Sequence, residues 1–111
     1  MKEPLRLRTV AEGRTVYLSV SGELTYATAP LFHEHVVQVL ASSRPFLVVD
    51  LEGLTFCDSV GLSALIGAQR RAGAVGGGVT LCGVHGTLQR CLQVTGAGTL
   101  FTIDASDARE A

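Results

Sequence analysis

Residues 46–65 constrain the fold of this chain more than any other stretch. The stretch opens with the apolar run FLVV at 46–49, which Asp50 closes and Gly53 follows. An uninterrupted apolar run that contains β-branched residues is typical of a strand buried on both faces of a sheet. From Leu62 onward, apolar residues recur at helical spacing. The stretch therefore predicts a buried strand, a short connection and a helix that packs beside the strand.

The connection between that strand and that helix carries the first candidate site. Residues 54–57 are expected to form a loop, and Asp58 and Ser59 stand where such residues act as helix N-caps, a role worth about 1 kcal/mol. Gly61 lies in the first helical turn, where glycine costs about 1 kcal/mol relative to alanine. Its missing side chain predicts a close approach by another part of the molecule. A helix N-terminus also accommodates an anion, so this fold would tolerate a phosphate on Ser59.

The rest of the sequence alternates strands and helices after an opening hairpin. The expected elements are strands near 5–9 and 15–21, a helix from Thr28 and Pro30 to about 41, the strand 46–49, a helix at 60–72 that ends at Gly73, a strand at 79–82, a helix at 87–94 stopped by Gly96, and a strand at 100–103. The order is ββαβαβαβ. It predicts an α/β fold with a mixed, mostly parallel sheet, an opening β-hairpin and helices packed against the sheet.

Length and composition fit one small domain. The chain has 111 residues, 47% of them hydrophobic, which predicts a single domain over 1–111 with a core at about 5–103 and a polar tail at 104–111 that could form a short helix. A net charge of −1 gives no support for nucleic-acid binding. No apolar run approaches the roughly 18 residues of a membrane span. The cysteines are odd in number and widely spaced in the sequence, at Cys57, Cys82 and Cys91. We therefore expect them to be small buried residues in a reducing cytoplasm.

Other candidate sites have weaker support. Asp50 ends a buried strand, as a phospho-accepting aspartate does in receiver domains, but the acidic pair and the lysine of such domains are missing from the expected places. His33 and His35 point to different faces of their helix, which argues against a metal site. The run at 76–78 (GGG) lacks the Lys-Ser/Thr of a phosphate-binding loop and fits a turn.

Several short motifs together resemble a known family. They are Gly22-Glu23-Leu24, Thr28-Ala29-Pro30, Val48-Val49-Asp50-Leu51, Phe56 with Asp58-Ser59 and Gly61-Leu62, Arg71 with Gly76-Gly77, and Leu92 with Thr95-Gly96. This pattern, from about Leu5 to Ile103, resembles the STAS domain family, and most closely the bacterial anti-sigma factor antagonists. The family usually has an acidic residue after the Gly-Glu-Leu turn, where this chain has Thr25, which carries no charge.

The resemblance implies a mechanism called partner switching. The unmodified antagonist binds an anti-sigma factor of the histidine-kinase-like ATPase fold and so frees a sigma factor. Ser59 would be phosphorylated by that partner and dephosphorylated by a serine phosphatase. The nucleotide belongs to the partner, so the chain itself needs no cofactor and is not an enzyme. The expected partner-binding residues are Gly22, Glu23, Leu24, Thr25, Thr28, Phe56, Cys57, Asp58, Val60, Gly61 and Leu62.

Two other functions remain open at this point. A STAS subunit of a membrane transport or lipid-trafficking complex would share the fold and bind a partner without using a phosphoserine. A small enzyme with Ser59 or Cys57 as nucleophile would need a pocket at that residue, whereas a binding module predicts an exposed turn. We expect residues 22–28 and 58–62 to lie side by side and to form the partner surface.

Overall fold

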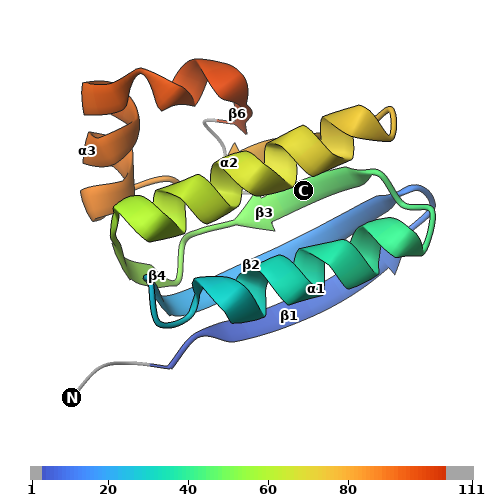
Figure 1. Ribbon diagram of the computed structural model, residues 1–111, viewed down its shortest axis with the longest axis horizontal. Coiled ribbons are helices and arrows are strands. Elements are labelled where there is room, and N and C mark those ends of the chain that lie inside the picture. Colours follow the sequence, from blue (N-terminus) through green and yellow to red (C-terminus); the bar gives the residue numbers. More distant parts are fainter. Residues whose placement is uncertain (1–3, 105–111) are drawn as a thin grey trace.

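The computed structural model describes residues 4–104. Strands and helices alternate along most of the chain (Figure 1). The elements are β1 (Arg6–Glu12), β2 (Thr15–Leu24), α1 (Ala29–Ala41), β3 (Phe46–Asp50), β4 (Leu54–Cys57), α2 (Ser59–Ala74), β5 (Gly78–Cys82), α3 (Gly86–Thr95), the 3₁₀ helix η1 (Ala97–Leu100) and β6 (Thr102–Asp104).

The sheet is mixed and mostly parallel, as the sequence predicts. Its strand order is β1-β2-β3-β5-β6; β1 pairs antiparallel with β2, and the other neighbours in this order pair in parallel. This arrangement confirms the opening hairpin and the α/β class. It also places β3, the strand of the 46–49 run, at the centre of the sheet, between β2 and β5.

Residues 54–57, which were expected to form a loop, form the strand β4. β2 was expected to end near Ser21, but it continues to Leu24. Gly22, with a φ of 89°, lies where the pairing changes register, and the last residues of β2 then pair in parallel with β4. The extra strand therefore exists because β2 bends at Gly22 instead of stopping there.

Helices α1 and α2 lie side by side over one face of the sheet (Figure 1). The core lies between these helices and β2, β3 and β5, and Ile66 packs against it half-buried. The largest fully buried side chains are Val16, Leu18, Val20, Leu24, Phe32, Val36, Leu47, Val49, Leu51, Leu65, Leu81 and Leu88.

The ends of the helices differ in detail from the predicted ones. Pro30 lies in the first turn of α1, and Gly96, in the left-handed conformation, ends α3, as predicted. However, α2 continues through Gly73 to Ala74, and Leu100 belongs to η1 rather than to the last strand. Asp104, placed in the tail by the sequence, closes β6; the predicted short helix of the tail falls on residues outside the described range.

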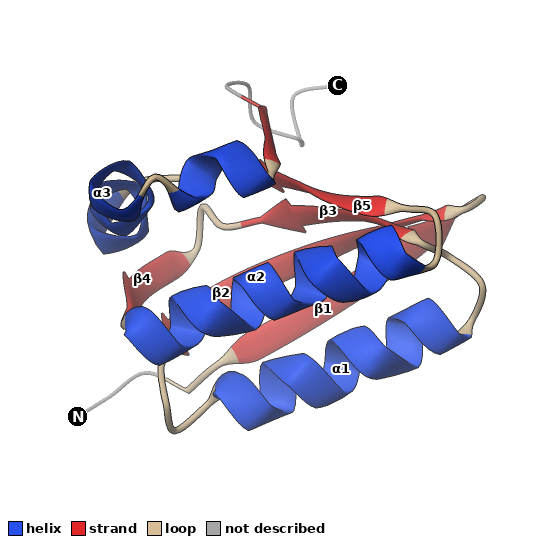
Figure 2. Cartoon of the chain, turned by 45° about the horizontal axis from the view of Figure 1, so that its top comes forward, coloured by secondary structure: helices blue, strands red, loops and turns tan. Residues whose placement is uncertain are grey.

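The start of α2, the end of β2 and β4 meet at one end of the molecule (Figure 1). Helix α3 packs against β4 at the same end (Figure 2). The Cys57 N–H of β4 donates a hydrogen bond to the Thr87 hydroxyl of α3 at 3.2 Å. Within residues 4–104, no helix is both long enough and apolar enough to span a membrane.

Candidate functional site

Ser59 is the first residue of α2 and is exposed. The cap that precedes it is Asp58, which has an extended backbone and accepts a hydrogen bond from the Gly61 N–H at 2.8 Å through Oδ1. The sequence allowed either residue to be the N-cap. The structure gives that role to Asp58, so the Ser59 hydroxyl is not used to cap the helix.

Asp58 also joins the loop after β2 to the start of α2. Its Oδ2 accepts the Tyr26 N–H at 3.0 Å, and its own N–H donates to the Leu24 carbonyl at 3.3 Å. Burial raises the pKa of Asp58, but hydrogen bonds from the backbone N–H groups of Gly61, Tyr26 and Val60 outweigh it, so the net pKa is lowered. The carboxylate is therefore ionised at neutral pH and holds both segments in place.

At Gly61, α2 lies very close to the end of β2. A Cβ built on Gly61 would lie 2.1 Å from the Leu24 carbonyl oxygen and 3.0 Å from Cys57 Sγ. The expected close approach at this glycine is confirmed. Together with the Asp58 hydrogen bonds, it confirms that residues 22–28 and 58–62 lie side by side.

Three exposed aromatic or apolar side chains belong to the segments that meet at Ser59. Tyr26 of the loop is 67% exposed, Phe56 of β4 43% and Val60 of α2 45%. We call Tyr26, Phe56, Ser59 and Val60 the Ser59 surface. Large exposed apolar side chains around a small hydroxyl are typical of a surface that binds another protein.

Most of the other predicted partner-binding residues lie beneath this surface. Buried side chains shape this surface from below, and direct binding of a partner by these residues stays a prediction. Glu23, Thr28 and Asp58 are half-buried. The buried residues of the predicted set are Gly22, Leu24, Thr25, Cys57, Gly61 and Leu62.

Thr25 is built into the turn that leads to α1. It is only 4% exposed, and its hydroxyl accepts the Ala27 N–H at 3.3 Å. The Thr28 hydroxyl accepts the Thr25 N–H at 2.9 Å and donates to the Glu23 carbonyl at 2.8 Å, so Thr28, the N-cap residue of α1, makes no side-chain hydrogen bond to the helix. These bonds fix the backbone that presents Tyr26.

Tyr26 is the surface residue that the sequence did not single out. It lies between two small residues, Thr25 and Ala27, in a segment without hydrophobic periodicity, so the sequence pattern did not indicate its exposure. A large aromatic residue in a loop of otherwise small side chains is the feature that could have identified it. Its exposure exceeds that of Phe56 and Val60, both of which were predicted.

Cys57 does not have the environment of a catalytic thiol. Burial, with smaller effects from Cys91 and Asp58, raises its pKa from 9.0 to about 12. A thiol with such a pKa stays protonated at neutral pH and is a poor nucleophile.

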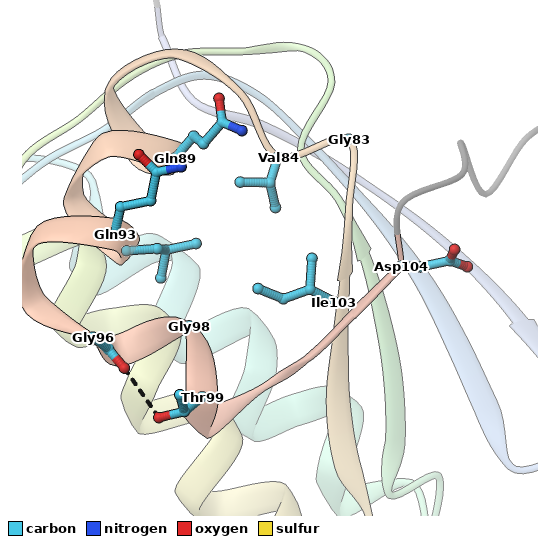
Figure 3. Close-up of a pocket in the computed structure, with 10 residues that line it drawn as sticks. Gly83, Val84, Gln89, Gln93, Gly96, Gly98, Thr99, Ile103 and Asp104 are labelled. Atoms are coloured by element: carbon cyan, nitrogen blue, oxygen red, sulfur yellow. Dashed lines mark hydrogen bonds between the residues drawn. The ribbon is translucent and has the colours of Figure 1, made fainter.

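Three cavities in the described part of the chain lie away from this thiol and from Ser59. Neither Cys57 nor Ser59 lines any of three cavities of about 440, 600 and 630 Å³ in the described part of the chain. The cavity of about 630 Å³ lies between α3, η1 and β6, with Gln89, Gln93, Val84 and Ile103 around it (Figure 3). Ser59 itself lies in an exposed turn at the start of α2.

The remaining candidates have structural roles. Asp50 is almost fully buried at the end of β3, and its Oδ1 accepts the Glu52 N–H at 3.0 Å. His35 Nε2 lies 2.6 Å from the Thr9 hydroxyl, and His85 Nε2 lies 2.9 Å from the Glu52 carbonyl oxygen. Among the residues from 4 to 104, no three His, Cys, Asp or Glu side chains are grouped so that they could hold a metal ion.

Comparison with known sequences identifies relatives over most of the chain. The family described as "Mlab, STAS domain" matches residues 7–103. The anti-sigma-F factor antagonist RsfB of Mycobacterium tuberculosis is 36% identical over 66 residues, which are 59% of this chain and 54% of that protein. The match thus spans only about half the length of this curated relative.

Solved structures show the same fold. An anti-sigma factor antagonist from Mycobacterium paratuberculosis superposes with a TM-score of 0.82 and 27% identity, over 93% of this chain and 87% of that one. The Bacillus cell fate determinant SpoIIAA in its phosphorylated form superposes with a TM-score of 0.71 and 21% identity, over 93% of both chains. The second likeness is evidence for the fold alone.

Proposed function

Because this chain belongs to the STAS domain family, we propose that it is an anti-sigma factor antagonist. In this proposal it binds an anti-sigma factor of the histidine-kinase-like ATPase fold in the cytoplasm and releases a sigma factor. The observation that carries the proposal is the exposed Ser59 at the start of α2, which Asp58 relieves of the capping role and which belongs to segments that also expose Tyr26, Phe56 and Val60. The names of two relatives, both anti-sigma factor antagonists, support it.

Phosphorylation of Ser59 would switch this binding. A phosphoserine carries about −1.5 to −2 charges at pH 7. At the first position of α2 this charge meets the positive end of the helix dipole, a stabilising contribution of roughly 0.3–1 kcal/mol that the neighbouring Asp58 partly offsets. The fold should therefore change little. A partner that packs on the apolar Ser59 surface would have to desolvate the dianion, which should weaken binding strongly.

Calorimetric titration of the anti-sigma factor with both forms of the chain tests this switch. We expect the phosphorylated form to bind about a thousandfold more weakly, a loss of roughly 4 kcal/mol. Ser59→Ala should bind like the unmodified chain and accept no phosphate, and Ser59→Asp should weaken binding only partly, because it carries a single charge. Ser63→Ala, at an exposed serine one turn further along α2, is the control and should still be switched. Equal affinities of the two forms would remove the switch role from Ser59.

A second candidate is a STAS subunit of a membrane transport or lipid-trafficking complex. Two observations favour it: the matching family description names Mlab, and Thr25 stands uncharged and buried where antagonists usually carry an acidic residue. Such a subunit would use the same surface without phosphorylation.

Capture of binding proteins from native extract, with the unmodified chain as bait, separates the two candidates. A captured anti-sigma factor supports the first, and a captured transporter ATPase or permease supports the second. Tyr26→Ala should lose the partner in either case, because the surface is shared. Tyr17→Ala, at a half-exposed tyrosine on β2, is the matched control and should retain it.

A further inference from the structure

β1 forms an edge of the sheet with one side unpaired among the described strands. It pairs with β2 along all seven residues in an unbroken antiparallel register. Six of its seven residues are exposed. Proteins usually protect an edge strand with charged side chains, a bulge, a proline or short length, because its free N–H and C=O groups can pair with another chain. Within residues 6–12, β1 has no bulge, no proline and is not short, and its charged residues are of both signs.

The sequence of β1 is complementary to itself in the antiparallel direction. Only one register pairs all seven residues with the same strand of a second copy, and it is centred on Thr9. In that register Arg6 lies opposite Glu12 of the second copy, and two-fold symmetry produces this pair twice. Opposite charges directly across an antiparallel pair are stabilising. The register centred on Arg8 would instead set Arg8 against itself, and the one centred on Val10 would pair only residues 8–12.

The side chains between these charged pairs also match. Val10 is 58% exposed in the single chain and would lie opposite Arg8, whose aliphatic stem can cover it. Thr9 would lie opposite itself, and threonine pairs across strands are favourable. The hydrogen bond between the Thr9 hydroxyl and His35 Nε2 joins the centre of β1 to α1.

We propose that β1 is a self-association surface, through which two copies of this chain pair antiparallel and join their sheets into one. The contact consists of backbone hydrogen bonds along the strand and two Arg6–Glu12 pairs. Tyr26, Phe56, Ser59 and Val60 are not part of it. The dimer would thus carry two Ser59 surfaces, and its existence does not depend on the proposed partner or on phosphorylation.

Sedimentation equilibrium of the full chain, at concentrations up to about 1 mM, tests this proposal. We expect a monomer–dimer equilibrium. Arg6→Glu would set two glutamates against each other and Glu12→Arg two arginines, so each single variant should raise the dimer dissociation constant about tenfold or more. The double variant restores opposite charges and should return the constant to within about threefold of the unmodified value.

Arg90→Glu is the control, because it makes the same charge change at an exposed position on α3. It should leave the dissociation constant unchanged. Far-UV circular dichroism of each variant checks that the fold is intact; the substituted side chains are exposed, so we expect it to be. A chain that stays monomeric throughout this range, single variants that dimerise normally, or a double variant that fails to recover would each overturn the proposal.

Discussion

At Gly61, α2 and the end of β2 lie too close for any side chain. A Cβ would come 2.1 Å from the Leu24 carbonyl oxygen, a backbone atom that cannot move without shifting β2. Gly67, in the same helix, has no atom within 4 Å of such a Cβ. Gly61→Ala should therefore lower the free energy of unfolding and weaken partner binding, whereas Gly67→Ala should raise stability by about 0.5–1 kcal/mol. Urea denaturation of both variants measures this, and equal effects would contradict it.

Asp58 should make the stability of the chain depend on pH. Its pKa in the folded chain is below the ordinary value of 3.8, so its carboxylate contributes stability that is present above the unfolded pKa and is lost as the pH falls through the folded pKa. Asp58→Asn should therefore be less stable than the unmodified chain at pH 7, with the difference shrinking below about pH 4. Urea denaturation across this range tests it. Glu34→Gln, at an exposed carboxylate on α1, is the control. A difference that does not change with pH would contradict the prediction.

At the level of single residues, the sequence predicts some features of the candidate site and misses others. The motif at 58–62 predicts a helix start, a close contact at Gly61 and an exposed Ser59, and all three are present. It does not predict that Thr25 is buried while Tyr26 is presented. That outcome depends on hydrogen bonds between Thr25, Thr28 and Glu23, which form only once the chain has turned into α1.

At the level of elements, one side-chain hydrogen bond joins α3 to β4. The Thr87 hydroxyl accepts the Cys57 N–H at 3.2 Å. Thr87→Val keeps the shape but removes this acceptor, and a buried N–H without a partner costs roughly 1–3 kcal/mol. We expect faster hydrogen exchange at the Cys57 amide and a lower free energy of unfolding. Thr87→Ser keeps the hydroxyl and should behave nearly like the unmodified chain; if both variants behave alike, the bond does not hold β4.

Elements with a strong apolar pattern could be predicted from the sequence, and the short strand β4 could not. The uninterrupted apolar run at 46–49 identifies β3, and the helical spacing after Leu62 identifies α2. β4 has four residues, of which only the first and last are buried, so it lacks the alternation of a strand. Its existence depends on the bend of β2 at Gly22, a tertiary feature that no local pattern encodes.

For the whole molecule, one continuous core predicts cooperative unfolding. Val49 is fully buried in the central strand, and its neighbours in the core come from β2, β5 and both covering helices. Val49→Thr puts a hydroxyl into this core without changing the volume much, which should cost roughly 1–3 kcal/mol. Val94→Thr makes the same change at a residue that is 80% exposed and should stay within about 0.5 kcal/mol of the unmodified chain.

Scanning calorimetry distinguishes this single core from separately folding parts. If the chain unfolds as one unit, the calorimetric and van't Hoff enthalpies of the unmodified chain agree, and Val49→Thr lowers the Tm of that one transition. The C-terminal elements α3 and η1 should then lose their structure together with β3, because Leu88 and Leu92 belong to the same core as Val49. Two separate transitions, of which Val49→Thr shifts only one, would mean that the α3 end, which holds β4 beside Ser59, can open while the rest of the sheet stays folded.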